Sequence, residues 1–245
     1  NQKERDWLMA AQNGESHGYS SPTKNMCSYG LEKIGIGCFA KSGLEAVVLP
    51  ASVKEVCAKA FEWCKQLRSV QLNEELEKLG MEDINSYGKH ERRVFACSAI
   101  RSIRLPSTLK RIKAGMFYWC TNLKNIEIPN GVEYIGEKCF CGCGIQNIVF
   151  PASVKEVGAE AFYTCDMLRN VQLNEGLEKL GAKKIIGRTE CEGEVFSKTA
   201  IECIKIPSTL KRIEVGTFSS CRALRSVEIP SGVECIGKRS FCDCK

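Results

Sequence analysis

A repeated pattern of aliphatic residues and phenylalanine constrains the fold of this chain more than any other feature. The pattern begins nine times with an aliphatic residue, which is followed three positions later by Ile, Val or Leu and then by one Phe. A unit of about 22 residues cannot bury its own apolar face, but stacked units bury a continuous core. The pattern therefore predicts a solenoid of about nine coils. The repeats begin at Leu31, Val53, Leu76, Leu109, Val132, Val154, Leu177, Leu210 and Val233.

The spacing of the repeats shows that the array is itself duplicated. Successive starts are 22, 23, 33 and 23 residues apart, and the same series then recurs, so a block of 101 residues occurs twice. Residues 51–80 match residues 152–181 at 22 of 30 positions. We therefore divide the solenoid, residues 31–245, into a first block (31–131), a second block (132–232) and a truncated final repeat (233–245). The two longest repeats carry 11 extra residues, within Met81–Arg93 and Ala182–Glu194.

Each repeat contains one tract with the alternation of a half-buried strand. In the tract from Leu67 to Leu72, the alternation places Val70 and Leu72 inside and Ser69 and Gln71 outside. Proline follows most of these tracts and ends the strand, because it has no N–H to donate. We expect the Phe of each repeat to fill the space between this strand and the return side of the coil.

The first thirty residues do not repeat. Good helix formers occupy Lys3–Ala11, and Gly14 follows them at a position that could end a helix. We interpret residues 1–30 as a cap over the open end of the solenoid, which could be helical, with a linker as the alternative. The chain has no initiator Met and stops inside the repeat pattern, so we expect it to be part of a longer protein.

One tract carries a family resemblance. The sequence LKNIEIPNGVEYIGEKCF, from Leu123 to Phe140, resembles the BspA-type leucine-rich repeats of bacterial and protist proteins. The resemblance recurs nine times between residues 31 and 245. It implies an α/β-type but mostly β, curved, right-handed solenoid that binds other molecules, often on cell surfaces, and has no enzymatic activity. The two inserts and the 16 cysteines depart from the bacterial pattern.

The cysteines occupy defined places on the repeat. The third residue after each Phe is always small, and neighbouring coils lie about 4.8 Å apart. This spacing is longer than the roughly 3.8 Å between Cβ atoms that a disulfide prefers. We therefore expect buried thiols and, from them, a reducing compartment. The ladder of small residues is Ser42, Cys64, Ser98, Cys120, Cys143, Cys165, Thr199, Cys221 and Cys244.

Several classes of function have little support in the sequence. The chain has only two histidines, and His90 is equivalent to Cys191 on the repeat, which separates them by about 19 Å over four coils. A zinc site at Cys141 and Cys143 lacks the second ligand pair that structural zinc sites show. We therefore predict no catalytic residue, no cofactor and no metal. Nucleic acid is an unlikely partner, because the net charge is only +6 and few aromatic residues lie on the strands. No stretch approaches the roughly 18 apolar residues of a membrane span.

The outward positions of the strands are the main candidates for binding. They form rows across the predicted sheet, with mixed charge, small polar residues and a basic edge, a chemistry that suits an extended protein partner. The central-row candidates are Gln71, Arg104, Glu127, Gln172, Lys205 and Glu228. The basic-edge candidates are Arg68, Arg101, Lys124, Arg169 and Arg225. The two inserts are a second candidate surface, through Tyr87, His90, Arg92, Lys184 and Arg188.

The sequence therefore predicts a non-enzymatic protein-interaction module or scaffold, whose partner is unknown and which could be one subunit of a larger complex. The thiol ladder favours an intracellular setting. The family resemblance favours the alternative, a secreted or cell-surface adhesin that binds host or matrix proteins.

Overall fold

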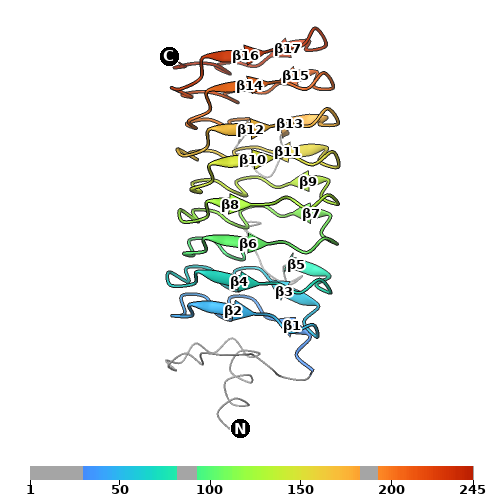
Figure 1. The fold of residues 1–245 in the computed structure, drawn as a ribbon, viewed down its shortest axis with the longest axis vertical. Helices are drawn as coiled ribbons and strands as arrows, with labels where there is room; N and C mark the ends of the chain where they lie inside the picture. Colours follow the sequence, from blue (N-terminus) through green and yellow to red (C-terminus); the bar gives the residue numbers. More distant parts are fainter. Residues whose placement is uncertain (1–29, 82–92, 183–192, 245) are drawn as a thin grey trace, which may run out of the picture.

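The computed structural model describes residues 30–81, 93–182 and 193–244. Their coils stack in one column along the long axis of the molecule, with the first coil at one end and the last at the other (Figure 1). The cap or linker expected at residues 1–30 lies outside the described residues, apart from Gly30.

One row of parallel strands coincides with the alternating tracts of the sequence. The row is hydrogen-bonded in three groups, β2 to β8, β10 with β12, and β14 with β16, and we name it as a whole the front sheet. In β4 the central Val70 is buried and its two neighbours are exposed, as the alternation predicts. The proline that follows most of these strands lies just beyond the hydrogen-bonded residues. The row consists of β2 (Ala46–Val48), β4 (Ser69–Gln71), β6 (Ser102–Arg104), β8 (Asn125–Ile126), β10 (Asn147–Val149), β12 (Asn170–Gln172), β14 (Cys203–Lys205) and β16 (Ser226–Glu228).

A second row of parallel strands, the back sheet, runs beside the first (Figure 1). The sequence shows its buried aliphatic residues but predicts no strand there, because most of these tracts are too short for a visible alternation. The row consists of β1 (Lys33–Ile34), β3 (Glu55–Cys57), β5 (Lys78–Met81), β7 (Arg111–Ile112), β9 (Tyr134–Ile135), β11 (Glu156–Gly158), β13 (Lys179–Ala182), β15 (Arg212–Ile213) and β17 (Cys235–Ile236).

Turns join the two sheets on both edges, and the described residues contain no helix. The prediction of a mostly β solenoid is confirmed, and the nine back strands agree with about nine coils. The two longest back strands, β5 and β13, each contain a glycine with positive φ, Gly80 and Gly181, where the strand register shifts. In the sequence, the two inserts follow directly after these strands.

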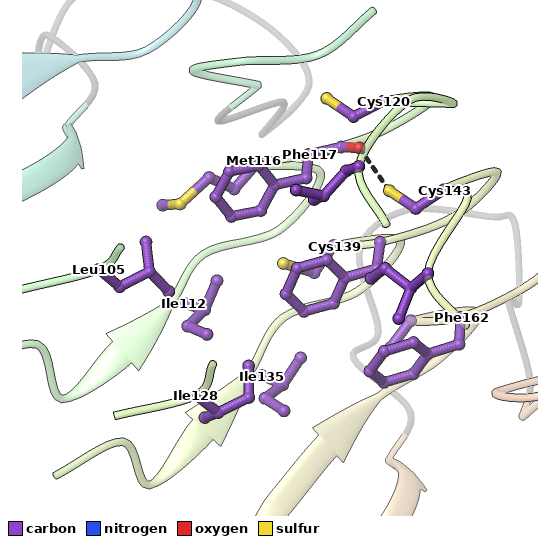
Figure 2. Close-up of a cluster of buried hydrophobic side chains, with 14 of the residues drawn as sticks. Leu105, Ile112, Met116, Phe117, Cys120, Ile128, Ile135, Cys139, Cys143 and Phe162 are labelled. Carbon is purple, nitrogen blue, oxygen red and sulfur yellow. Dashed lines mark hydrogen bonds between the residues drawn. The ribbon is translucent and has the colours of Figure 1, made fainter. Parts of the chain in front are cut away.

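The phenylalanines form a continuous stack through the core. Their ring centroids are 5.2 to 5.6 Å apart and their planes differ by 2 to 20° along the whole series from Phe39 to Phe241. The seven middle rings have no exposed surface. Figure 2 shows Phe117 and Phe162 pointing into the space that is lined by Ile112 and Ile135 of the back sheet. This confirms that Phe fills the space between the two sides of each coil.

The ladder cysteines make a contact that the sequence did not reveal. Each ladder thiol donates a hydrogen bond to the backbone carbonyl of the Phe in the preceding coil, as Cys143 does to Phe117 in Figure 2, where Sγ and O are 3.0 Å apart. The Phe117 carbonyl also accepts from the amide of Cys120, so the thiol is its second donor and links two neighbouring coils as well as filling core space. The other pairs are Cys64 with Phe39, Cys120 with Phe95, Cys165 with Phe140, Cys221 with Phe196 and Cys244 with Phe218.

Candidate protein-binding surface

The strand register produces the rows that the sequence predicts. Ser69 pairs with Ser102 and Ser102 with Asn125, while Gln71 pairs with Arg104. The second block repeats the arrangement, because Val149 pairs with Gln172. Since equivalent outward residues stand beside each other on neighbouring strands, the front sheet presents ordered rows of side chains.

All six candidates of the central row are exposed. Arg104 lies 3.7 Å from Glu74, and Lys205 lies 3.5 Å from Glu228. In the first block, Ser102, Arg104 and Asn125 belong to a shallow depression across β4, β6 and β8. Exposed ion pairs of this kind add little stability, so their charges remain available to a partner.

The five candidates of the basic edge are also exposed, and backbone hydrogen bonds align them. The amide of Arg101 donates to the carbonyl of Arg68, and the amide of Lys124 donates to that of Arg101, both at 3.2 Å. Three cations therefore follow one another on adjacent coils of the first block. In the second block, Glu202 separates Arg169 from Arg225, so the positive row is interrupted.

Two acidic residues beside the front sheet were not singled out by the sequence analysis. Glu74 accepts hydrogen bonds from the amide and the hydroxyl of Ser107, at 2.8 and 2.9 Å, and Glu175 accepts the same pair from Ser208, both at 2.9 Å. These bonds from serine lower the pKa of both carboxyl groups. The recurrence of Glu and Ser at an offset of 101 residues was the available sequence signal.

The insert candidates cannot be placed in the same way. Tyr87, His90, Arg92, Lys184 and Arg188 all lie outside the described residues. Their relation to the front sheet therefore stays a prediction.

Burial makes several thiols less reactive. Burial raises the pKa of Cys120 to about 12 and that of Cys38 and Cys141 to about 11, so these groups are protonated near neutral pH. The fourteen cysteines in the described part of the chain are all free. Two of them, Cys203 and Cys242, are exposed.

Within residues 30–81, 93–182 and 193–244, no three His, Cys, Asp or Glu side chains are grouped so that they could hold a metal ion. The same part of the chain has no helix with the length and hydropathy needed to cross a bilayer.

The fold agrees with solved structures of bacterial proteins. A leucine-rich repeat protein from Bacteroides ovatus is 23% identical, with a TM-score of 0.56 over 87% of this chain and 62% of that one. The pneumococcal vaccine antigen PcpA is 22% identical, with a TM-score of 0.56 over 81% of this chain and 48% of that one. A leucine rich cell surface protein from Faecalibacterium prausnitzii is 22% identical, with a TM-score of 0.50 over 91% of this chain and 65% of that one.

This chain thus spans less than two thirds of each of these proteins. A comparison with curated protein sequences found no match. The model of the BspA type leucine rich repeat region matches in six copies, over residues 29–87, 89–189 and 189–245. The chain therefore belongs to the family of proteins with BspA-type leucine-rich repeats.

Proposed function

We propose that the chain is a non-enzymatic protein-interaction module that binds an extended partner across its front sheet. The observation that carries the proposal is the exposed, in-register set of rows, above all the run of Arg68, Arg101 and Lys124 on adjacent coils. Rows of this kind give an extended partner a repeated set of contacts, and the positive edge steers an acidic one.

We further propose a secreted or cell-surface setting, in place of the intracellular one that the thiols favoured. The ladder thiols are hydrogen-bonded to buried carbonyls, so packing explains why they are free and the compartment need not. Their burial also protects them from oxidation, because the reactive form is the thiolate. Support for the surface setting comes from the solved structures, of which one is described as a cell surface protein and another as a vaccine antigen.

The test is an affinity capture with the immobilised chain, offered an extracellular-matrix extract and a cytosolic extract in parallel. The variant Arg68→Glu/Arg101→Glu/Lys124→Glu reverses the positive row. A matched control, Lys110→Glu/Lys211→Glu/Lys238→Glu, makes the same change in charge beside the back sheet. We expect a matrix protein that the parent and the control retain and the front variant loses. Equal loss by both variants would show that only net charge matters.

The inserts are proposed as a second binding surface, because insertions in repeat proteins often line a binding face. Deleting residues 82–92 should weaken capture of a partner and leave the melting temperature nearly unchanged. Unchanged capture would exclude the inserts from the binding surface.

A further inference from the structure

The edge of the column that carries the Phe turns has an aromatic groove in the first block. Trp63 and Trp119 are 44% and 47% exposed, although both are large apolar residues. Backbone hydrogen bonds place them two coils apart with Cys97 in the coil between, because Trp63 N donates to Ala96 O and Cys97 N donates to Tyr118 O. The short side chain of Cys97 leaves a hollow between the two tryptophans. We name this hollow, lined by Trp63, Lys65, Arg93, Cys97, Tyr118 and Trp119, the corner groove.

The wall on the Trp119 side is built by successive contacts. The Arg93 guanidinium lies 4.4 Å from the centre of the Tyr118 ring. The ring centres of Tyr118 and Trp119 are 6.3 Å apart, in an edge-to-face arrangement. Trp119 in turn lies against Gly142 of the next coil, where any Cβ would approach the indole to 2.9 Å. This wall is therefore held in place before any partner arrives, which lowers the entropic cost of binding.

The duplicated block shows that the fold does not require these aromatic residues. Thr164 and Ser220 stand at the positions equivalent to Trp63 and Trp119. All four residues have φ between 55 and 62°, so the backbone of the turn is the same with either kind of side chain. The exposed tryptophans are thus not needed for packing, and large exposed aromatic residues are typical anchors of protein interfaces.

The charges around the groove are positive and differ in the same way between the blocks. Lys65 lies 5.6 Å from the Trp63 ring centre, and Lys41 belongs to a hollow on the other side of Trp63. Cys97 lies at the centre of the groove, where the charge of Arg93 lowers the pKa of its thiol and that of Glu62 raises it. In the second block the equivalents of Lys41, Lys65 and Arg93 are Gly142, Asp166 and Glu194.

The surroundings favour an acidic ligand. Two cations, Lys65 and Arg93, line the groove, and the basic edge of the front sheet begins three residues after Lys65. A cationic ligand would be repelled, and a neutral sugar would gain hydrogen bonds but no attraction between opposite charges. The aromatic walls require an apolar group on the same ligand.

We propose that the corner groove docks an extended acidic segment of a partner protein that inserts an aromatic or aliphatic side chain between Trp63 and Trp119. The carboxylates of the segment then face Lys65 and Arg93. This surface is separate from the front sheet. The variants that test it change other residues than those that test the front sheet, so each proposal can fail independently.

The experiment is selection from a synthetic hexapeptide library in which each position is Asp, Glu, Lys, Phe, Leu, Ala or Gly. We expect the parent to enrich peptides that combine Asp or Glu with Phe or Leu. The affinity of the most enriched peptide is then measured by fluorescence anisotropy. Trp63→Thr/Trp119→Ser installs the residues of the second block and should weaken binding by about 30-fold, as expected for loss of an aromatic anchor.

Two further variants keep the test decisive. Lys65→Asp/Arg93→Glu retains both tryptophans and should also weaken binding by tenfold or more, whereas Thr164→Ala/Ser220→Ala in the second block should change nothing. No enrichment of acidic apolar peptides would overturn the proposal, and so would equal binding by the tryptophan variant. Binding of cellohexaose in preference to the peptides would assign the groove to a neutral glycan instead.

Discussion

The first and second blocks share their core, whereas parts of their surface differ. Phe95 and Phe196, which are equivalent, both have no exposed surface and both stack on a Phe on either side. On the edge with the Phe turns, by contrast, Trp63 and Trp119 of the first block are replaced by Thr164 and Ser220 at the equivalent positions of the second.

The difference separates the residues that make the solenoid from those that the solenoid displays. An interior position is constrained by close packing, so a duplicated coil keeps its Phe, its aliphatic residues and its small ladder residue. An exposed position on the same backbone is free to change. The places where the blocks diverge therefore show which exposed side chains the fold does not require.

The largest expected effect tests whether the two cores are equivalent. Phe95→Ala and Phe196→Ala should each lower the free energy of unfolding by about 3–5 kcal/mol, because each leaves a cavity between two rings. The measurement is unfolding in urea followed by circular dichroism. Costs that differ by more than about 1.5 kcal/mol would show that the blocks pack differently.

The second prediction uses the one ladder position at which a cysteine of the second block replaces a serine of the first. Burial raises the pKa of Cys143 well above its ordinary value, so the folded protein holds this proton where the unfolded chain loses it. The resulting stability is complete below about pH 9, the pKa of the unfolded thiol, and is lost as the pH rises above it.

Cys143→Ser copies Ser42 and should remove that part of the alkaline destabilisation, about 1.4 kcal/mol per pH unit for one thiol. Urea unfolding midpoints between pH 8 and pH 11 measure it. Cys203→Ser, at an exposed thiol, is the control for the loss of one cysteine. A parallel shift of the Cys143→Ser curve at all pH values would contradict the titration.

The third prediction concerns the backbone under Trp119. Gly142 has a φ of 70° and no room for a Cβ beside the indole. Gly142→Ala should cost about 1–2 kcal/mol from the left-handed backbone alone, and more where the ring must move. In the Trp119→Ser background the cost should fall to the backbone part, as thermal unfolding of the four proteins would show. An equal cost in both backgrounds would mean that the indole does not restrict this glycine.

The smallest expected effect concerns the basic edge of the front sheet. Glu202→Arg completes the positive row of the second block, and Arg101→Glu interrupts that of the first. The first change should strengthen binding of poly-glutamate several-fold and the second should weaken it, while stability changes by about 0.5 kcal/mol or less. Titration at two salt concentrations measures both, and the differences should shrink as salt rises. Equal affinities in all three proteins would show that the basic edge does not bind acidic partners.

Much of the fold could be predicted because the same sequence pattern occurs nine times. The alternation around Val70, the buried Phe in every coil and the rows through Gln71 and Arg104 all follow from side-chain period and repeat length. The strands of the back sheet could not be predicted, since a pair of residues such as Arg111 and Ile112 has no period of its own. Their pairing depends on the neighbouring coils.

The sequence by itself determined that this chain is a solenoid, where the coils begin, which residues form the core and which rows face outward. The contacts that the residues of each row make with neighbouring coils were decided by the tertiary structure. It showed that the ladder thiols donate hydrogen bonds to buried carbonyls. The sequence could not reveal these bonds, because donor and acceptor come from different coils. It also brought Trp63, Arg93 and Trp119 around one hollow, since residues tens of positions apart in the sequence become neighbours only when the coils stack.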